Sequence, residues 1–516
     1  MIAELLVCAV AAFGPPLWVI AVLAGVAAVV AFVAFDQATL PIWIGRAVRY
    51  RWRKLRPAKP TALAKPFAAT VPGIGTVGLR WDGRYLVSMI SVHGTPHTPT
   101  VLVGSESLSS SALPLVTVAE LLRQHGGLEL AGLDVVSAGR RTSTTEYAHV
   151  YDAVVGERPS VGQRATWLVL RLDPDQCAAA LGWRVDTGQA AAAATERIRL
   201  AIEATGCRAK CLSPAEMVNA TKVLNHGREL EKLEEAWGGI QPDGGDFINL
   251  YEIPPSSITR AVFASLWSTS SSLTTITLRL VPTRSGVKVG ALVRLHTDGP
   301  LVHPPVLNLQ VPRGRAVAAF QATVPLGQPS TRYDLAMADM TFDDLAHLRI
   351  IPGADGQILG NVQTGYPATL PLVDPMQPTL VKVNANLAIV LQTVARAGAT
   401  GARVAILTDR PALWAPITER GSIYVADPNA AHDAAVIVND LGDAVPALRP
   451  ELAGRTVLKV CRTLDEHDAD VAITQLDQDS IRVVTAGRTI ALSVRFSRSE
   501  PRFFQHAMPR PAGAGL

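Results

Sequence analysis

Acidic residues near the C-terminal end are the strongest candidates for chemistry in this chain. Asp465, Glu466, Asp468 and Asp470 fall in the stretch 465–470, between segments with strand patterns. Carboxylate oxygens are the preferred ligands of hard divalent cations, so Asp468 and Asp470 are a candidate metal site that would hold a cation beside a sugar-nucleotide diphosphate. A solvated acidic turn accounts for the same residues, and we favour that interpretation.

Two more patterns match the spacing of known sites but lack the surroundings that those sites need. Cys207 and Cys211 have no second Cys or His pair nearby to complete four zinc ligands. The stretch Gly73 to Gly78 matches G-x-G-x-x-G, but a proline-rich segment precedes it and a strand pattern follows, whereas dinucleotide binding needs a strand before and a helix after. The sequence contains no P-loop lysine motif, no H-E-x-x-H and no G-x-S-x-G. We therefore expect no catalytic residue, no cofactor and no small-molecule substrate, which favours a protein that is not an enzyme.

The chain is organised around an uncharged apolar run, Leu17 to Phe35, that has the length of a membrane span. Its 19 residues would cover about 28 Å as a helix, close to the ~30 Å of the hydrocarbon core. Residues 36–60 then carry seven basic residues and one acidic residue, and basic residues beside a span stay on the cytoplasmic side. We therefore expect a protein of the inner membrane whose bulk is cytoplasmic.

The first sixteen residues leave the number of spans open. They are apolar apart from Glu4 but shorter than a span, and Pro15-Pro16 disfavours one continuous helix from Met1 to Phe35. The region 1–35 is therefore either a helical hairpin with a short first helix or a single anchor preceded by a partial segment. A cleaved signal peptide is disfavoured, because the start lacks a positive n-region and the charge bias opposes export.

The basic segment that follows can form a helix at the membrane surface. From Pro41 the apolar side chains recur at i, i+4, i+8 and i+11, and another face carries arginines. Such a helix would lie at the headgroups and attract anionic lipid, although a stop-transfer signal alone explains the charges equally well. Within the span, small residues at i, i+4 and i+7 would permit close packing with another helix. The candidate membrane and juxtamembrane residues are Trp18, Ala21, Gly25, Ala28, Arg46, Arg49, Arg53 and Arg56.

Composition limits the classes of partner. The formal net charge is +4, of which residues 36–60 supply +6, so the remaining chain is slightly acidic. A nucleic-acid surface would need clustered positive charge on the folded part, so no nucleic-acid partner is expected. Five scattered cysteines, an odd number, suit a reducing compartment rather than a disulfide framework.

The pattern along the chain predicts a membrane-anchored α/β (α+β) protein with mixed cytosolic units. Local signals include a hairpin at Asp82-Gly83, an Ala-rich helix from about Gln189 to Ala204, and a capping box at Ser213-Pro214-Ala215-Glu216. Beyond Asn386, alternating helical and strand patterns predict a mainly parallel sheet with added antiparallel strands. The expected divisions are a transmembrane region 1–35, a basic helix and linker 36–70, a first unit 71–237, a linker 238–255, a second unit 256–500 and a flexible tail 501–516.

The order of these features resembles the EccE family, a membrane component of the mycobacterial type VII (ESX) secretion machine. The resemblance rests on LWVIAVLAGVAAVVAF, the basic exit RYRWRKLRP, the hairpin LRWDGRYLVSMI, and the order TWLVLRLDP, Ala-rich helix, LSPAEM. It covers about Leu5 to Trp237, with RVAILTDRPALWAPI as the best match beyond. The short first helix departs from the paired N-terminal helices of the family.

The resemblance implies a non-catalytic structural subunit of an inner-membrane secretion complex, placed beside EccB, EccC and EccD. Its helices would serve assembly and its cytosolic surface would contact partners, with ATP hydrolysis left to another subunit. The alternative is a membrane-anchored glycosyltransferase-like enzyme that uses the Asp cluster. A pocket that gathers Asp468 and Asp470 with other carboxylates would favour the enzyme, whereas an exposed turn would favour the structural subunit.

Overall fold

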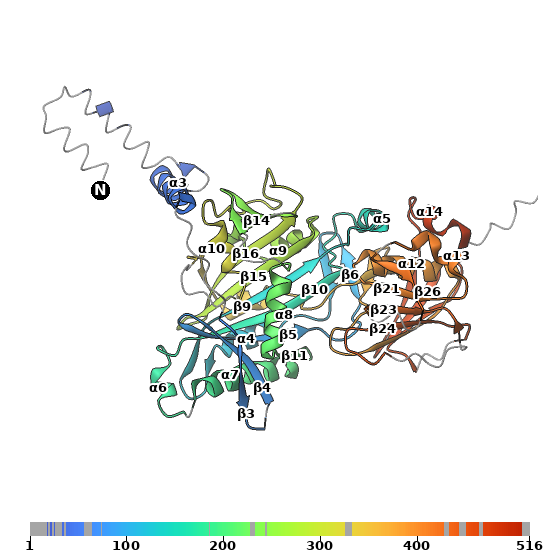
Figure 1. The fold of residues 1–516 in the computed structure, drawn as a ribbon, viewed down its shortest axis with the longest axis horizontal. Helices are drawn as coiled ribbons and strands as arrows, with labels where there is room; N and C mark the ends of the chain where they lie inside the picture. The colour runs from blue at the N-terminus through green and yellow to red at the C-terminus, as the bar shows by residue number, and fades with distance from the viewer. Residues whose placement is uncertain are drawn as a thin grey trace, which may run out of the picture.

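A computed structural model of the chain shows a sheet-rich mixed α/β protein, which confirms the mixed α/β part of the expected fold class (Figure 1). It describes residues 38–55, 64–73, 75–184, 186–227, 233–242, 245–325, 333–419, 421–427, 433–442, 450–463 and 468–507, together with positions 18, 21, 22, 25, 34 and 35. Within this part of the chain, none of the helices is both long and apolar enough to cross a bilayer. The expected transmembrane region 1–35 falls outside the described residues, apart from those single positions.

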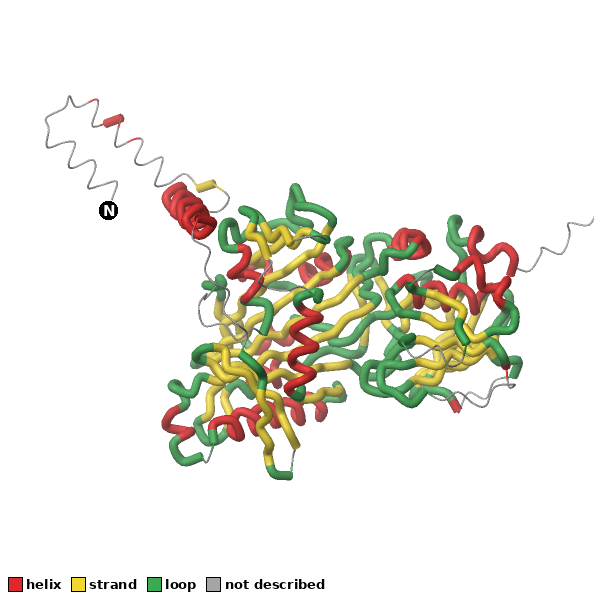
Figure 2. The backbone as a smooth tube through the Cα atoms, viewed as in Figure 1, coloured by secondary structure: helices red, strands yellow, loops and turns green. Residues whose placement is uncertain are grey.

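The described strands form two large sheets that lie side by side along the molecule (Figure 2). In the first, the antiparallel sheet, the main order is β12-β13-β14-β16-β15-β9-β10-β5-β4-β3. Its strands are β3 (Phe67–Val71), β4 (Gly75–Asp82), β5 (Tyr85–His93), β8 (Arg123–Gln124), β9 (Leu128–Arg140), β10 (Gln163–Leu172), β11 (Arg208–Cys211), β12 (Leu233–Glu235), β13 (Gly239–Pro242), β14 (Phe247–Ile253), β15 (Leu273–Pro282), β16 (Val287–Thr297) and β17 (Ala338–Met340).

The second, the mixed sheet, confirms the parallel pattern predicted beyond Asn386. Its order is β22-β21-β23-β24-β20-β25-β26-β27-β18-β19-β6-β7, and the pairs from β22 to β25 are parallel while the later pairs are antiparallel. Its strands are β6 (Thr100–Val103), β7 (Glu106–Ser109), β18 (Gln357–Asn361), β19 (Pro367–Leu370), β20 (Thr379–Asn384), β21 (Val404–Leu407), β22 (Ile423–Val425), β23 (Val436–Asn439), β24 (Thr456–Val460), β25 (Val471–Gln475), β26 (Ser480–Thr485) and β27 (Arg488–Ser493). A small pair, β1 (Ala34–Phe35) and β2 (Ala38–Thr39), precedes both sheets.

Helices cover both faces of the antiparallel sheet and flank the mixed sheet. One apolar core lies under α4, α7, α9 and α11, and a second core lies on the opposite sheet face under α8 and α10. The helices are α3 (Leu40–Leu55), α4 (Leu115–Glu120), α5 (Glu146–Val155), α6 (Ala178–Leu181), α7 (Thr187–Ala204), α8 (Pro214–Leu224), α9 (Arg260–Ser268), α10 (Ala316–Gln321), α11 (Phe342–His347), α12 (Leu387–Ala399), α13 (Pro411–Trp414) and α14 (Pro501–Phe504), with short 3-10 turns η2 (Pro255–Ser257), η3 (Ala415–Ile417) and η7 (Gln505–Ala507).

The local signals of the sequence are confirmed. Asp82 pairs with Tyr85 across the predicted hairpin, and Gly83 takes the positive φ of 57° that the turn requires. At the start of α8, the Ser213 side chain accepts from the Glu216 backbone N–H while the Glu216 side chain accepts from the Ser213 N–H. Short-range turn and capping chemistry therefore determined these elements.

The predicted linker 238–255 does not separate two structural units. It contains β13 and β14, and all seven residues of β14 are buried. On the far side of β14 and β16, β15 pairs directly with β9 of the expected first unit. The Gly- and Asp-rich residues that suggested a linker join two paired strands, because the same residue types serve hairpin turns.

The predicted flexible tail also begins too early. Pro501–Phe504 form α14, and Phe503 and Phe504 are buried against Tyr147 with ring centroids 5.1 and 5.7 Å away. Two adjacent aromatic residues bury enough apolar surface to fix a segment whose proline and arginine content indicated a tail. Residues 508–516 lie outside the described part.

A buried ion pair joins the two sheets. Arg164 of β10 places Nη2 3.2 Å from Oδ2 of Asp355, and the same oxygen accepts the Val161 N–H at 2.9 Å. Burial raises the pKa of Asp355 and lowers that of Arg164, with their mutual attraction offsetting part of each shift. Arg208 and Asp374 form a second bridge between the sheets at 2.8 Å. Removing one partner of such a pair would leave a buried charge without compensation.

A second buried cluster lies inside the antiparallel sheet. The Asp134 carboxylate of β9 accepts hydrogen bonds from Nε and Nη2 of Arg279, at 2.8 and 2.9 Å. It accepts another from Nη2 of Arg171 at 2.6 Å. Burial alone would raise the pKa of Asp134, but the two arginines outweigh it and hold that pKa well below its usual range. The Asp134 carboxylate therefore stays ionised. Its ion pairs join three neighbouring strands, β10, β9 and β15.

Asp134→Asn should lower the free energy of unfolding by about 3 kcal/mol at neutral pH, because two desolvated arginines lose their carboxylate. An acid whose folded pKa is depressed stabilises fully above its unfolded value, about pH 4, and loses that contribution as the pH falls further. Urea titrations of the purified protein should show a difference in the free energy of unfolding between wild type and variant, and this difference should become smaller below about pH 4. Equal unfolding free energies at neutral pH, or a difference that does not change with pH, would contradict an ionised Asp134 held by two arginines.

Candidate functional site

The basic helix α3 docks on the edge of the antiparallel sheet through aromatic contacts. Trp237, between β12 and β13, packs edge-on against Trp43 with ring centroids 5.5 Å apart and against Tyr50 at 5.3 Å. The Tyr50 hydroxyl also donates to the carbonyl oxygen of Glu235 at 3.1 Å. α3 forms where predicted, and one of its faces is held by the folded body.

Polar contacts and a glycine complete this docking seat, which comprises Glu235, Trp237 and Gly314. Arg53 donates to the carbonyl oxygen of Gly314 and pairs with Glu235 at 3.4 Å. Burial raises the pKa of Glu235, and Arg53 offsets part of that shift. A Cβ at Gly314 would lie 2.8 Å from the Trp237 ring and 3.3 Å from Cβ of Tyr50. Only glycine leaves room for the helix there.

The opposite face of α3 is open and carries both apolar and basic side chains. The predicted apolar stripe is exposed, from 48% at Ile44 to 81% at Leu55. The basic side chains of Arg49, Arg51 and Lys54 are exposed as well. The helix therefore has a face for the protein and a face with the composition of a membrane-surface helix.

The predicted juxtamembrane arginines divide between these faces. Arg53 is bound in the docking seat, and Arg46 lines a polar cavity of about 280 Å³ together with Glu252 and Arg315. Arg49 is exposed, and Arg56 lies outside the described residues. The arginines were predicted to share one face toward lipid, and the structure instead assigns two of them to contacts with the body.

The structure describes only some of the candidate residues of the apolar run. Trp18, Ala21 and Gly25 are helical and exposed, and a Cβ on Gly25 would meet no described atom within 4 Å. Ala28 lies outside the described residues. The packing of the small-residue stripe thus stays a prediction.

The acidic cluster does not converge on a metal site in the described part of the chain. Asp468 is exposed and pairs with Lys382 at 3.1 Å, while Asp470 accepts the backbone N–H of Leu380 at 2.8 Å. Both carboxylates thus bind residues of β20. Among the described residues no group of three His, Cys, Asp or Glu side chains could hold a metal ion; residues 464–467 lie outside them.

The cysteine and glycine patterns have structural explanations. The Cys207 and Cys211 thiols donate to the Ala112 carbonyl oxygen and to Glu196, both at 3.3 Å, and burial raises the pKa of each thiol, which keeps it unreactive. Gly73 and Gly75 turn the hairpin between β3 and β4 with positive φ angles. A Cβ at Gly78 would come within 2.8 Å of the backbone at 212–214, so close chain packing requires that glycine.

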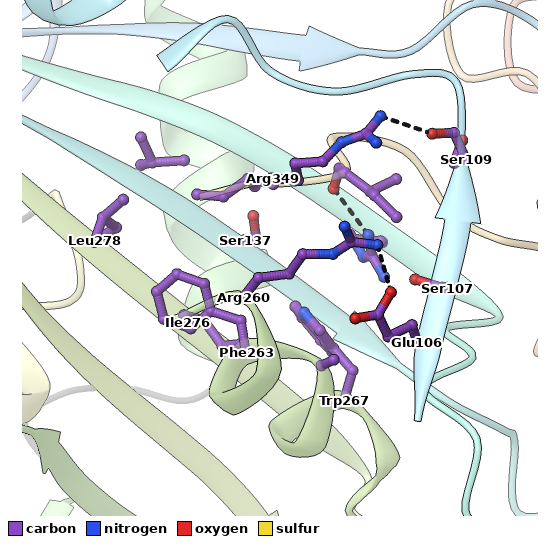
Figure 3. Close-up of a pocket in the computed structure, with 15 residues that line it drawn as sticks. Glu106, Ser107, Ser109, Ser137, Arg260, Phe263, Trp267, Ile276, Leu278 and Arg349 are labelled. Atoms are coloured by element: carbon purple, nitrogen blue, oxygen red, sulfur yellow. Dashed lines mark hydrogen bonds and ion pairs between the residues drawn. The ribbon is translucent and has the colours of Figure 1, made fainter. Parts of the chain in front are cut away.

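A small cavity of about 60 Å³ lies where α9 and β7 meet over β9 and β15 (Figure 3). Its floor is apolar, with Ile276 and Leu278, and Phe263 and Trp267 project from α9. At the rim Arg260 pairs with Glu106 at 2.9 Å and Arg349 donates to the Ser109 carbonyl oxygen at 3.1 Å. Its lining residues include no histidine or lysine, so its serines lack the bases that usually activate a serine nucleophile.

Sequence reasoning missed Trp237, Glu235 and Gly314, which form the docking seat. Trp237 stands in an aromatic-poor chain directly before Gly238-Gly239, and it was interpreted as the end of a unit. An isolated Trp at an expected boundary was the available signal, because such residues often anchor one segment on another.

Parts of the sequence are similar to known proteins. Residues 160–252 match the family model described as a putative type VII ESX secretion system translocon, EccE. The ESX-2 secretion system protein EccE2 of Mycobacterium tuberculosis (strain CDC 1551 / Oshkosh) is 25% identical over 83% of this chain and 82% of its own length. The ESX-5 secretion system protein EccE5 of Mycobacterium marinum is 27% identical over 57% and 75%.

A third relative matches a shorter stretch more strongly. The ESX-1 secretion system protein EccE1 of Mycobacterium tuberculosis (strain ATCC 25618 / H37Rv) is 35% identical over 31% of this chain and 34% of its own length. The matched family segment runs from β10 into β14 and so crosses the docking seat at 235–237. The chain is therefore similar to EccE proteins of several ESX secretion systems.

Proposed function

We propose that this chain is a structural, non-catalytic subunit of a type VII (ESX) secretion system, anchored in the inner membrane by its N-terminal region. The docked helix α3 is the observation that carries the proposal, because one face binds the folded body and the other suits a membrane surface. The relatives are named as secretion system proteins, which supports the same role. The glycosyltransferase alternative loses its basis, since Asp468 and Asp470 brace β20.

The finer placement rests on the sequence and on the reach of the chain. The region 1–35 serves as one or two spans, and residues 36–60 keep the bulk of the protein in the cytoplasm. Leu40 follows Phe35 by five residues, which reach at most about 18 Å when fully extended. The start of α3 therefore lies at the headgroups, where its open face meets anionic lipid.

The role of α3 is to fix the folded body relative to the membrane and so to its neighbours. EccB, EccC and EccD are the proposed neighbours by family resemblance. A subunit of this kind positions its neighbours, because its two sheets hold the surfaces that contact them at a fixed distance from the membrane anchor.

Trp237→Ala should weaken the docking of α3 by about 2 kcal/mol, because two edge-on aromatic contacts are lost. We expect the variant to stay in the membrane fraction at normal abundance but to recover less of the secretion complex after mild-detergent purification. Trp183→Ala is the matched control, because Trp183 is 68% exposed and lies outside the docking seat. Equal recovery from both variants would show that docking of α3 does not matter for assembly.

The double variant Asp468→Ala, Asp470→Ala should leave secretion nearly intact. The Asp470 hydrogen bond to the Leu380 backbone contributes about 1 kcal/mol, which a folded body of this size tolerates. Secretion of a reporter substrate and the level of the variant protein would be measured together. Lost secretion with normal protein levels and an intact complex would restore the enzymatic hypothesis.

Gly25→Leu should preserve membrane insertion, because it adds hydrophobicity to the span. If Ala21, Gly25 and Ala28 pack on a neighbouring helix, the larger side chain blocks close approach and lowers co-purification of the other membrane subunits. Val22→Leu is the control, because it enlarges a residue beside the small-residue stripe. Full recovery of the complex from Gly25→Leu would leave the run as a plain anchor.

A further inference from the structure

Residues 299–312, the central part of the loop between β16 and α10, present two apolar side chains to solvent. Val302 is 88% exposed and Leu307 is 87% exposed, the highest values among the large apolar side chains in the described ranges. This central part contains no Asp, Glu, Lys or Arg, although Asp298 precedes it and Arg313 follows it. We call it the apolar loop.

Its conformation is fixed by contacts at both ends. Near its start, the Leu301 N–H donates to Oδ1 of Asn249 at 3.0 Å. Near its end, Gln310 exchanges two backbone hydrogen bonds with Glu252, at 2.7 and 2.9 Å. Leu309 is buried and Val306 packs on the core, so the apolar loop has inward and outward apolar side chains.

Four prolines, at positions 300, 304, 305 and 312, further restrict the apolar loop. Because they reduce the conformations open to the unfolded chain, they lower the entropic cost of holding this shape. Val302 and Leu307 are thus held outward by an ordered loop, which is unfavourable in water unless something covers them.

The apolar loop lies next to the docking seat of α3. Gln310 and Val311 line the same cavity as Arg46 of α3, and Gly314, two residues beyond the loop, accepts from Arg53. In Figure 1, α3, α10 and β14 occupy one corner of the molecule. The apolar loop is therefore close enough to α3 for both to meet one surface.

We propose that Val302 and Leu307 insert into the headgroup region of the membrane and form a second lipid contact beside α3. This inference rests on the proposed function for the position of α3. An uncharged loop with two outward aliphatic side chains suits the boundary between headgroups and acyl chains, and the exposed basic residues of α3 supply attraction to anionic lipid. Two lipid contacts, by the helix α3 and by the apolar loop, would fix the tilt of the folded body on the membrane. With α3 as the single contact, the body could still rotate about the axis of that helix.

Site-specific fluorescence on the full-length protein tests this proposal. The variants Val302→Cys and Leu307→Cys would be labelled with the environment-sensitive fluorophore NBD and reconstituted in vesicles of phosphatidylcholine and phosphatidylglycerol. Unsubstituted protein gives the background from the native cysteines. We expect NBD emission at shorter wavelength at both positions, and loss of most of the intensity when lipids carrying a nitroxide are included.

Two further positions make the outcomes distinct. Leu452→Cys is the control on the mixed sheet, where a side chain that is 55% exposed should report water. Leu55→Cys reports whether α3 itself meets lipid. Quenching at Leu55 with solvent-like signals at Val302 and Leu307 would overturn the loop contact and leave the proposed function standing, whereas no quenching at any of the three would contradict both. Signals that become protected only in the purified multisubunit complex would assign the loop to a protein partner and overturn the lipid contact.

Discussion

The packing of Trp237 against Trp43 and Tyr50 is the constraint on which the rest of the structure depends. Through this packing, the helix α3, whose composition suits a membrane surface, is also bound to the folded body. The seat allows little variation, because a side chain at Gly314 would overlap the Trp237 ring. An anchor joined by a flexible linker would give the body many orientations, and this seat selects one.

Buried arginine pairs extend that constraint across the molecule. Arg164 with Asp355 ties the antiparallel sheet to the mixed sheet, and Arg396 with Glu500 holds the C-terminal α14 against α12 and α5 at 2.9 Å. Each pair is desolvated, so its formation contributes little net stability, but the loss of one partner is costly. Such pairs favour one arrangement over its alternatives. A body with a fixed distance between its membrane edge and its far end is suited to hold neighbouring subunits in place.

The sequence was informative where local chemistry decides structure. The spacing of apolar residues after Pro41 predicted α3, Asp82-Gly83 predicted its hairpin, and Ser213 with Glu216 predicted the start of α8. It failed where one segment depends on a distant one. The stretch 238–255 was interpreted as a linker because its turn residues are conspicuous, whereas β14 is a strand through its neighbours β13 and β16. Phe503 and Phe504 are fixed by Tyr147, more than 350 positions away, and the Arg53 contacts with Glu235 and Gly314 follow no local pattern.

The central claim is that α3 is seated on Trp237 while the protein is in the membrane. Carbodiimide cross-linking of the variant Arg53→Lys tests it, because Arg53 pairs with the Glu235 carboxylate at 3.4 Å and the substitution leaves Tyr50, Trp237 and Gly314 unchanged. Mass spectrometry of peptides from treated native membranes should find residues 53 and 235 joined by an amide bond. In the control variant Gly45→Lys, residue 45 should not be joined to Glu235, because a Cβ at position 45 faces open space. Linking to Glu235 from both positions, or from neither, would contradict a seated helix.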